Sequence, residues 1–312
     1  MIKFNKPKFW DNKNFSFFSI FLLPLSILTL LYILLKKKLS KIKAYKIPII
    51  CVGNIYIGGT GKTPSSILIA NELSNIGYKP VIVRKFYKDH FDEYNQIKNN
   101  FKNLIINKSR DKGIIQAEEE GYNTVILDDG MQDYRIKKNL SIICFNQHQL
   151  VGNGMLLPAG PLREKIHSLK NTDIILINGK EDKKFEKKIL GINKNLQIFY
   201  SYYNPVNINE FTGHKLFALA GIANPENFFT LLEENNLNIS KKLVFPDHYR
   251  FKKNELQKII NIAKQKKLKI IMTEKDFFKL SNFNFNEFNY LKVNLEINNK
   301  KELIDRIRKI YD

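Results

Sequence analysis

The chain is poor in cysteine, with two cysteines among 312 residues. A disulfide scaffold needs a dense and even set of cysteines, so that class of small secreted protein is excluded. No CxxC or CxxH spacing occurs, which argues against a structural zinc site. Cys51 and Cys144 each sit within a short apolar run, and we expect both to be buried strand residues.

Glycine and proline are also infrequent, at 15 and 10 residues, which excludes collagen-like and low-complexity chains. Hydrophobic residues make up 44% of the chain and charged residues 26%, ordinary values for a folded protein rather than a disordered one. A length of 312 residues exceeds that of a typical single domain, so we expect two domains.

Acidic residues are scarce relative to basic ones, with 30 Asp and Glu against 51 Lys and Arg, a net charge of +21. Such an excess indicates either an anionic partner or compositional drift, because the chain is crowded with Lys, Asn and Ile. Lysine far outnumbers arginine, and no RNP, zinc-finger or arginine-rich signature is present. We therefore expect no nucleic-acid partner and favour an anionic membrane surface.

Charge is absent altogether from Phe15 to Leu35, a run of 21 residues bracketed by lysines. As a helix this run would be about 32 Å long, close to the ~30 Å hydrocarbon core of a bilayer. A cleaved signal peptide would have a shorter apolar core and a small-residue cleavage site, and neither is present. We expect residues 1–38 to form an N-terminal hydrophobic membrane-anchor helix with basic flanks. A single span and an in-plane helix kinked at Pro24 both fit, whereas apolarity on every face disfavours a buried soluble helix.

After residue 38, short apolar runs alternate with stretches of helical pattern. Such alternation predicts an α/β fold with largely parallel sheets covered on both faces. We expect a P-loop NTPase-like parallel-sheet domain over residues 39–168 and a second, smaller α/β domain over 169–312 that contributes to the substrate cleft. The predicted strands are residues 48–52, 80–83, 104–106, 124–127, 140–144, 174–177, 216–219, 242–245 and 270–272, and the predicted helices are 64–76, 111–120, 225–234, 254–264 and 300–310.

The strongest local signal is a glycine-rich turn between the first predicted strand and the first predicted helix. It contains Gly58, Gly59, Thr60, Gly61, Lys62 and Thr63. Small residues let backbone N–H groups converge on a phosphate, and the following helix N-terminus adds partial positive charge. We expect Lys62 to reach the β- and γ-phosphates of ATP and Thr63 to hold Mg²⁺. Tyr56 stands where the usual pattern has its first glycine, and a glycine-rich turn without a ligand is the alternative.

Two carboxylates, Asp128 and Asp129, follow the predicted strand 124–127. Carboxylates at the C-terminal edge of a parallel strand are placed like the acidic partner of a phosphate loop, so both are candidate Mg²⁺ ligands. An Asp-Gly turn that merely ends the strand is the alternative. The phosphate loop upstream favours the metal-binding interpretation.

Together with three further motifs, these elements resemble the tetraacyldisaccharide 4′-kinase family of lipid A biosynthesis. The matching stretches are GGTGKTP at 58–64, DDGMQ at 128–132, LPAGPLRE at 157–164, FPDHY at 245–249 and TEKD at 273–276. The stretch LPAGPLRE is the most specific of them, because a phosphate loop alone indicates only an NTPase.

This resemblance implies an N-terminal membrane anchor, a P-loop domain and a smaller α/β domain. It implies transfer of the γ-phosphoryl group of ATP, with Mg²⁺, to the 4′-hydroxyl of a lipid A disaccharide 1-phosphate precursor. It also implies a place at the inner (cytoplasmic) membrane, with the catalytic domains facing the cytoplasm. We infer no obligate protein partner.

The resemblance carries over site residues as well. Asp92 and Glu93 match the family's Asp-Glu pair, with Asp92 as the base-side carboxylate, and His248 matches its histidine partner. As a carboxylate, Glu93 is also a candidate to help hold the metal. The remaining matches are the catalytic residue Arg163 and the substrate residues Arg84, Arg110 and Glu164.

Departures from the family pattern occur at three places. VRKFY stands at 83–87 where the family has SRGYG, Tyr94 replaces a proline, and Asp133 replaces a histidine, which leaves the role of position 133 open. Two other functions also fit a phosphate loop: a kinase for another membrane lipid, and a membrane-tethered P-loop ATPase switch. The switch needs neither Asp92, His248 nor LPAGPLRE.

Overall fold

The computed structural model describes residues 6–11, 16–88, 90–247, 249–281 and 283–312. Its described residues form two compact units. The larger unit comprises Lys6–Phe86, Phe101–Tyr202 and Glu296–Asp312, and the smaller one comprises Tyr87–Asn100 and Tyr203–Leu295. The chain therefore passes more than once from one unit to the other.

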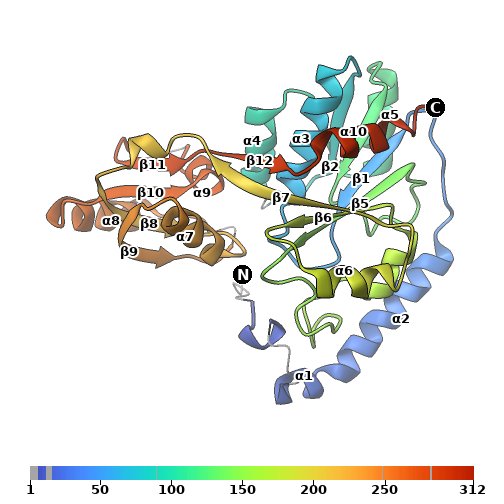
Figure 1. Cartoon of the computed structure of the whole chain (residues 1–312), viewed down its shortest axis with the longest axis horizontal. Coiled ribbons are helices and arrows are strands. Elements are labelled where there is room, and N and C mark those ends of the chain that lie inside the picture. Colours follow the sequence, from blue (N-terminus) through green and yellow to red (C-terminus); the bar gives the residue numbers. More distant parts are fainter. Residues whose placement is uncertain (1–5, 12–15, 89, 248, 282) are drawn as a thin grey trace. The chain divides into compact units, whose positions relative to one another are not determined.

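The larger unit is built on an eight-stranded sheet of order β12-β7-β6-β5-β1-β4-β2-β3 (Figure 1). The strands are β1 (Ile49–Gly53), β2 (Pro80–Lys85), β3 (Leu104–Asn107), β4 (Thr124–Asp128), β5 (Leu140–Asn146), β6 (Ile174–Asn178), β7 (Gln197–Pro205) and β12 (Val293–Ile297). The pairs from β7 through β3 are parallel. Every residue of β1, β4 and β5 is buried, as expected of strands that are covered on both faces.

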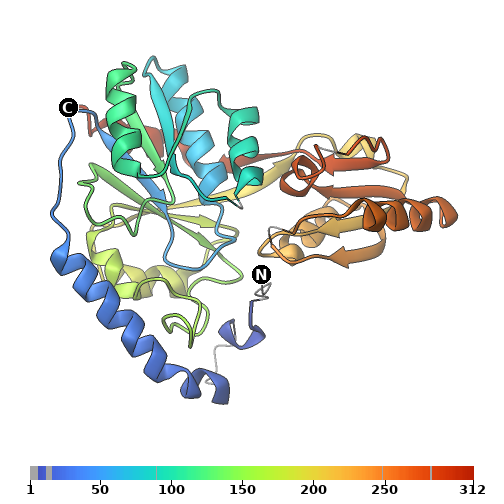
Figure 2. The same ribbon diagram turned by 180° about the vertical axis from the view of Figure 1, so that it is seen from behind.

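Helices cover both faces of this sheet. They are α2 (Leu23–Leu39), α3 (Lys62–Asn75), α5 (Arg110–Glu119), α6 (Lys183–Leu190) and α10 (Lys300–Arg308). Buried residues of α5 and α6 share one hydrophobic cluster with the sheet, and Leu30 and Ile33 of α2 pack against that cluster. Figures 1 and 2 accordingly show α2 running beside α6. The helix α3 contacts β1, β2 and β4, and α10 contacts α3.

The apolar N-terminal run is not one continuous helix. It forms α1 (Phe17–Phe21) and α2, which meet at Leu22, and Phe15 lies outside the described residues. Pro24 explains the break, because its ring would clash with the carbonyl of residue 20 and its nitrogen has no hydrogen to donate. Among the described residues, no helix has both the length and the apolar character that crossing a bilayer requires. The predicted single span is therefore not supported.

The smaller unit has a four-stranded parallel sheet of order β11-β10-β8-β9. Its strands are β8 (Lys215–Ala220), β9 (Asn238–Val244), β10 (Lys269–Thr273) and β11 (Phe288–Leu291), and its helices are α4 (Phe91–Asn100), α7 (Pro225–Glu234), α8 (Lys253–Gln265) and α9 (Glu274–Phe278). One hydrophobic cluster joins the sheet to α8, and a second joins it to α7. A second, smaller α/β unit is thus present.

The predicted boundary between residues 168 and 169 is wrong. The strands β6 and β7 extend the larger sheet, because Ile142 of β5 pairs in register with Ile174 of β6. The main division instead falls between Tyr202 and Tyr203, inside β7. The unit to which two helices belong was also not predicted. The helix α4 belongs to the smaller unit, and the C-terminal α10 belongs to the larger one.

Candidate active site

The glycine-rich turn has the backbone of a phosphate loop. Gly58, Gly59 and Gly61 take positive φ angles of 72°, 67° and 84°, a region in which side chains other than glycine are strained. Gly61 is the residue before α3, which begins at Lys62, so the loop leads directly into a helix N-terminus. Tyr56 is fully buried, and its hydroxyl donates to Asp11 at 2.5 Å. The fold therefore accommodates a tyrosine at position 56, where the usual phosphate-loop pattern has a glycine.

Two asparagines hold this loop, and sequence reasoning missed both. The side-chain amide of Asn54 donates to Thr60 Oγ1 at 2.8 Å, and that of Asn146 donates to the Gly59 carbonyl at 3.2 Å. Asn54 follows β1 and Asn146 ends the adjacent strand β5. Both could have been found by one signal, namely a polar residue at the carboxyl end of β1 or of the buried strand beside it.

Asp128, at the end of β4, lies directly against the start of α3. Its carboxylate accepts hydrogen bonds from Thr63 Oγ1 at 3.0 Å and from Ser66 Oγ at 3.1 Å. Arg84 Nη1 lies 3.0 Å from Asp128 Oδ2, and both side chains are almost fully buried. The structure thus places Arg84 as the counter-ion of a candidate metal ligand.

Asp129 is surrounded by cationic groups. Arg163 Nη2 and Nη1 donate to its two carboxylate oxygens at 2.7 and 3.3 Å, and Arg110 Nη2 donates to its backbone carbonyl at 2.5 Å. Burial acts to raise the pKa of Asp129, but the charges of Lys62, Arg163 and Arg110 outweigh it and hold that pKa well below its usual range. Asp129 is therefore an anion at neutral pH.

The LPAGPLRE stretch contacts the residues that connect β1 to the phosphate-loop glycines. The backbone N–H of Arg163 donates to the Ile55 carbonyl at 2.7 Å, and Arg163 Nη2 donates to the Asn54 carbonyl at 3.3 Å. Glu164 is 2% exposed, and its carboxylate accepts from Gln132 Nε2 at 3.3 Å. Arg163 and Glu164 therefore both contact the elements that carry the candidate ATP site.

A second cluster lies in the smaller unit, at the first turn of α4. Asp92 and Glu93 are 6% and 8% exposed. Lys275 Nζ, from α9, lies 3.5 Å from Asp92, 3.7 Å from Glu93 and 3.0 Å from Asp247. Burial acts to lower the pKa of Lys275, but Asp247, Glu93 and Asp92 outweigh it and raise that pKa above its usual value.

Lys275 was missed as a site residue, although TEKD at 273–276 was one of the matching motifs. A second lysine, Lys279, pairs with Asp276 at 2.7 Å and lies 3.9 Å from Asp92. The predicted partner His248 lies outside the described residues. The phosphate loop belongs to the larger unit and Asp92 to the smaller one.

The larger unit also offers oxygen donors that suit Mg²⁺. Thr63 Oγ1 and Asp128 Oδ2 lie 3.0 Å apart at the start of α3, and hydroxyl and carboxylate oxygens are the ligands that this hard cation prefers. Within the described part of the chain, no group of three or more His, Cys, Asp or Glu residues is arranged to hold a metal. The Thr63 hydroxyl and the Asp128 carboxylate thus fit Mg²⁺ as a partial set of oxygen ligands.

The sequence is similar to known proteins over its whole length. A profile of the family described as LpxK, tetraacyldisaccharide-1-P 4′-kinase, matches residues 18–312. The tetraacyldisaccharide 4′-kinase of Pelagibacter ubique (strain HTCC1062) is 41% identical over 314 residues, covering 100% of this chain and 99% of that protein. The chain belongs to this kinase family.

Two further matches have lower sequence identity. The tetraacyldisaccharide 4′-kinase of Francisella tularensis subsp. novicida (strain U112) is 32% identical, over 93% of this chain and 99% of the relative. The solved structure of LpxK from Aquifex aeolicus in complex with ATP has a TM-score of 0.73 and 22% identity, and covers 94% of this chain and 99% of its own. That similarity confirms the α/β fold with a mostly parallel sheet.

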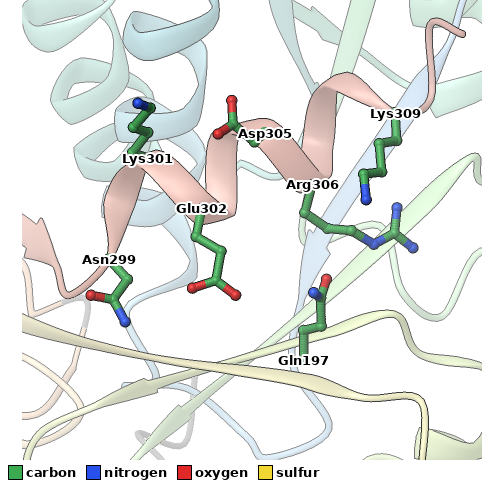
Figure 3. A pocket seen from close by; sticks show the side chains of 7 residues that line it. All are labelled: Gln197, Asn299, Lys301, Glu302, Asp305, Arg306 and Lys309. Atoms are coloured by element: carbon green, nitrogen blue, oxygen red, sulfur yellow. The ribbon is translucent and has the colours of Figure 1, made fainter.

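A pocket of about 480 Å³ lies elsewhere on the larger unit of this family member (Figure 3). It is lined by Gln197 of β7, by Asn299, by four residues of α10 (Lys301, Glu302, Asp305 and Arg306) and by Lys309, which follows that helix. None of these is a predicted site residue.

Proposed function

We propose that the chain transfers the γ-phosphoryl group of ATP to the 4′-hydroxyl of a lipid A disaccharide 1-phosphate precursor. Membership of the 4′-kinase family supports the acceptor. The observation that carries the phosphoryl-transfer chemistry is the hydrogen bond of Thr63 to Asp128 beneath the left-handed glycines of the loop. That pairing joins the loop hydroxyl to the strand-end carboxylate, as P-loop phosphotransferases require.

In this proposal the residues 58–63 bind the triphosphate of ATP through backbone N–H groups and the Lys62 ammonium. Thr63, Asp128 and Asp129 would hold Mg²⁺, directly or through water, with Glu93 assisting. The ion supplies neutralisation of the charge on the phosphate oxygens. Arg84 Nη1, 3.0 Å from Asp128 Oδ2, supplies the counter-charge of this buried carboxylate.

Arg163 contacts the carboxylate of Asp129 and Arg110 its backbone carbonyl, and both are proposed to orient Asp129 toward the loop. The planar fork of Arg163 also matches phosphate oxygens in a way that lysine cannot. Glu164 accepts a hydrogen bond from Gln132, so we propose that Glu164 supports the phosphate loop rather than contacting the substrate.

We propose Asp92 as the group that accepts the proton of the 4′-hydroxyl, with His248 as its partner. The hydroxyl oxygen forms a bond to the γ-phosphorus, the bond from that phosphorus to the β-γ bridging oxygen breaks, and ADP leaves. A sugar hydroxyl is a poor nucleophile, so a positioned carboxylate lowers the barrier. The Lys275 ammonium, 3.5 Å from Asp92, gives this buried carboxylate a cationic neighbour.

Membrane attachment is proposed to be in-plane, through α1 and α2. These helices expose large apolar side chains, among them Phe17, Phe21, Leu28 and Leu35, and α2 ends in three lysines. An apolar face with adjacent lysines suits the interface of an anionic leaflet. We place the protein at the inner (cytoplasmic) membrane, with both units on the cytoplasmic side and without a nucleic-acid or obligate protein partner.

The test is incubation of the full chain with ATP and a tetraacyldisaccharide 1-phosphate, followed by mass analysis of the lipid. We expect a lipid heavier by one phosphoryl group and phosphorylated at the 4′-position. Label released only as inorganic phosphate would indicate an ATPase switch. Phosphorylation of a polyprenol or another membrane lipid in preference to the disaccharide would indicate a different lipid kinase.

A further inference from the structure

The helices α1 and α2 carry a polar inner side. Ser26 of α2 is 6% exposed, donates to the Leu156 carbonyl at 2.9 Å and accepts from the Ala159 N–H at 3.0 Å. Ser19 of α1 is fully buried and accepts from the Asn153 side chain at 3.2 Å. Buried polar contacts of this kind are not needed for a tether that only dissolves in lipid. They fix the helices to the segment that leads into LPAGPLRE.

The last turn of α2 reaches the same segment through a charge. Lys37 Nζ lies 2.7 Å from Glu164 Oε2, and the Glu164 side chain is 2% exposed whereas that of Lys37 is 40% exposed. Lys37 also lies over the ring of Tyr134, 4.8 Å from its centroid. Burying a carboxylate without a nearby cation costs folding free energy, so the ion pair with Lys37 holds the Glu164 side chain in this position.

From Glu164 a series of hydrogen bonds continues to the phosphate loop. Gln132 Nε2 donates both to Glu164 Oε1, at 3.3 Å, and to the Asn54 carbonyl, at 3.1 Å. The side chain of Asn54 then donates to Thr60 Oγ1 at 2.8 Å. The anchor helix is thereby connected to a loop residue that lies between Gly59 and Gly61.

We propose that Lys37 is a positioning residue for the ATP site, acting through Glu164, Gln132 and Asn54 on the phosphate loop. The inference rests on the proposed function in one respect, namely that residues 58–63 bind ATP. In this proposal α2 supports the nucleotide site in addition to contributing to the proposed membrane attachment.

The test compares Lys37→Met with Lys38→Met in the full chain. Lys38 is exposed, is the next residue of the same helix and carries the same charge, so the two variants change membrane electrostatics equally. Initial rates are measured in vesicles that contain an anionic phospholipid and the disaccharide 1-phosphate. We expect Lys37→Met to raise the KM for ATP by about tenfold or more, because it leaves a buried carboxylate without its cation. The kcat and the KM for lipid should change little, Lys38→Met should match wild type, and Lys37→Arg should restore the KM for ATP.

Equal KM values for ATP in Lys37→Met and Lys38→Met would overturn the proposal. If Lys37→Met does not fold, the comparison moves to the Glu164→Gln background, which holds no charge to be left unpaired. There, Lys37→Met should not change the KM for ATP further, and an additional increase would show that Lys37 acts elsewhere. A Lys62→Ala variant with a normal KM and kcat would instead contradict the proposed ATP loop, which distinguishes the two failures.

Discussion

Arg163 holds Asp129 with two terminal nitrogens, Nη2 at 2.7 Å from one carboxylate oxygen and Nη1 at 3.3 Å from the other. The pair is only partly exposed, with side-chain exposures of 23% and 19%. A two-point contact fixes the plane of the carboxylate as well as its distance. Asp129 is thereby oriented by a residue of LPAGPLRE, which explains why that stretch accompanies the phosphate loop.

Arg163→Lys should therefore lower kcat/KM by roughly 10–100-fold, because an ammonium cannot make the two-point contact. Activity with saturating lipid and varied ATP is the measurement. Arg135→Lys is the matched control, since Arg135 is 59% exposed and pairs with Asp133. An Arg163→Lys enzyme indistinguishable from this control would remove the orienting role.

Lys62→Ala should lower kcat by about 10²–10³-fold, because an ammonium near the transferred phosphoryl group is lost where charge develops. The folded structure should persist, since Lys62 is the first residue of α3 and alanine is a good helix former. Circular dichroism checks the fold, and Lys112→Ala, an exposed lysine of α5, is the control. Near-normal turnover would exclude the loop from the mechanism.

Much of the secondary structure could be predicted from the sequence. The predicted helix 225–234 coincides with α7, and the predicted strand 270–272 lies within β10. Apolar runs bounded by turn residues are local signals, so they need no knowledge of the rest of the chain. By contrast, α4, with the sequence FDEYNQIKNN, was not predicted.

The division into units and the support of the site could not be predicted in the same way. Whether β6 joins one sheet or another depends on its pairing with β5, and both sheets use similar apolar strands. Likewise, Lys275 comes close to Asp92 only because α9 packs against α4, a contact that the sequence does not reveal. The left-handed loop glycines were predictable because glycine is itself the local signal.

Lys275→Met should destabilise the protein by on the order of 3 kcal/mol, because three carboxylates would face one another without the ammonium between them. Urea unfolding followed by fluorescence measures this loss. Lys258→Met, at an exposed position of α8, is the control and should stay within about 0.5 kcal/mol of wild type. Equal stability of the two variants would mean that Lys275 does not stabilise the cluster.

Replacing Phe17 and Phe21 with serine should weaken vesicle binding by at least about tenfold, because these rings are 78% and 73% exposed and would enter the interface. Co-sedimentation with anionic vesicles at low and high salt is the measurement. The remaining attachment should be salt-sensitive, since the lysines are left in place. Ile76→Ser, at an apolar position 46% exposed after α3, is the control. Unchanged binding at high salt would place the main attachment elsewhere.

Asp92→Asn should lower kcat by roughly 10²–10⁴-fold, the usual effect of losing a positioned general base. ATP binding should barely change, because Asp92 is not part of the phosphate loop. Adding His248→Ala should cost much less than the two single losses combined, since groups that act as a unit are not additive. The measurement is a double-mutant cycle on kcat, with nucleotide affinity followed in parallel. Fully additive losses, or an Asp92→Asn enzyme with near-normal kcat, would mean that proton transfer depends on another group.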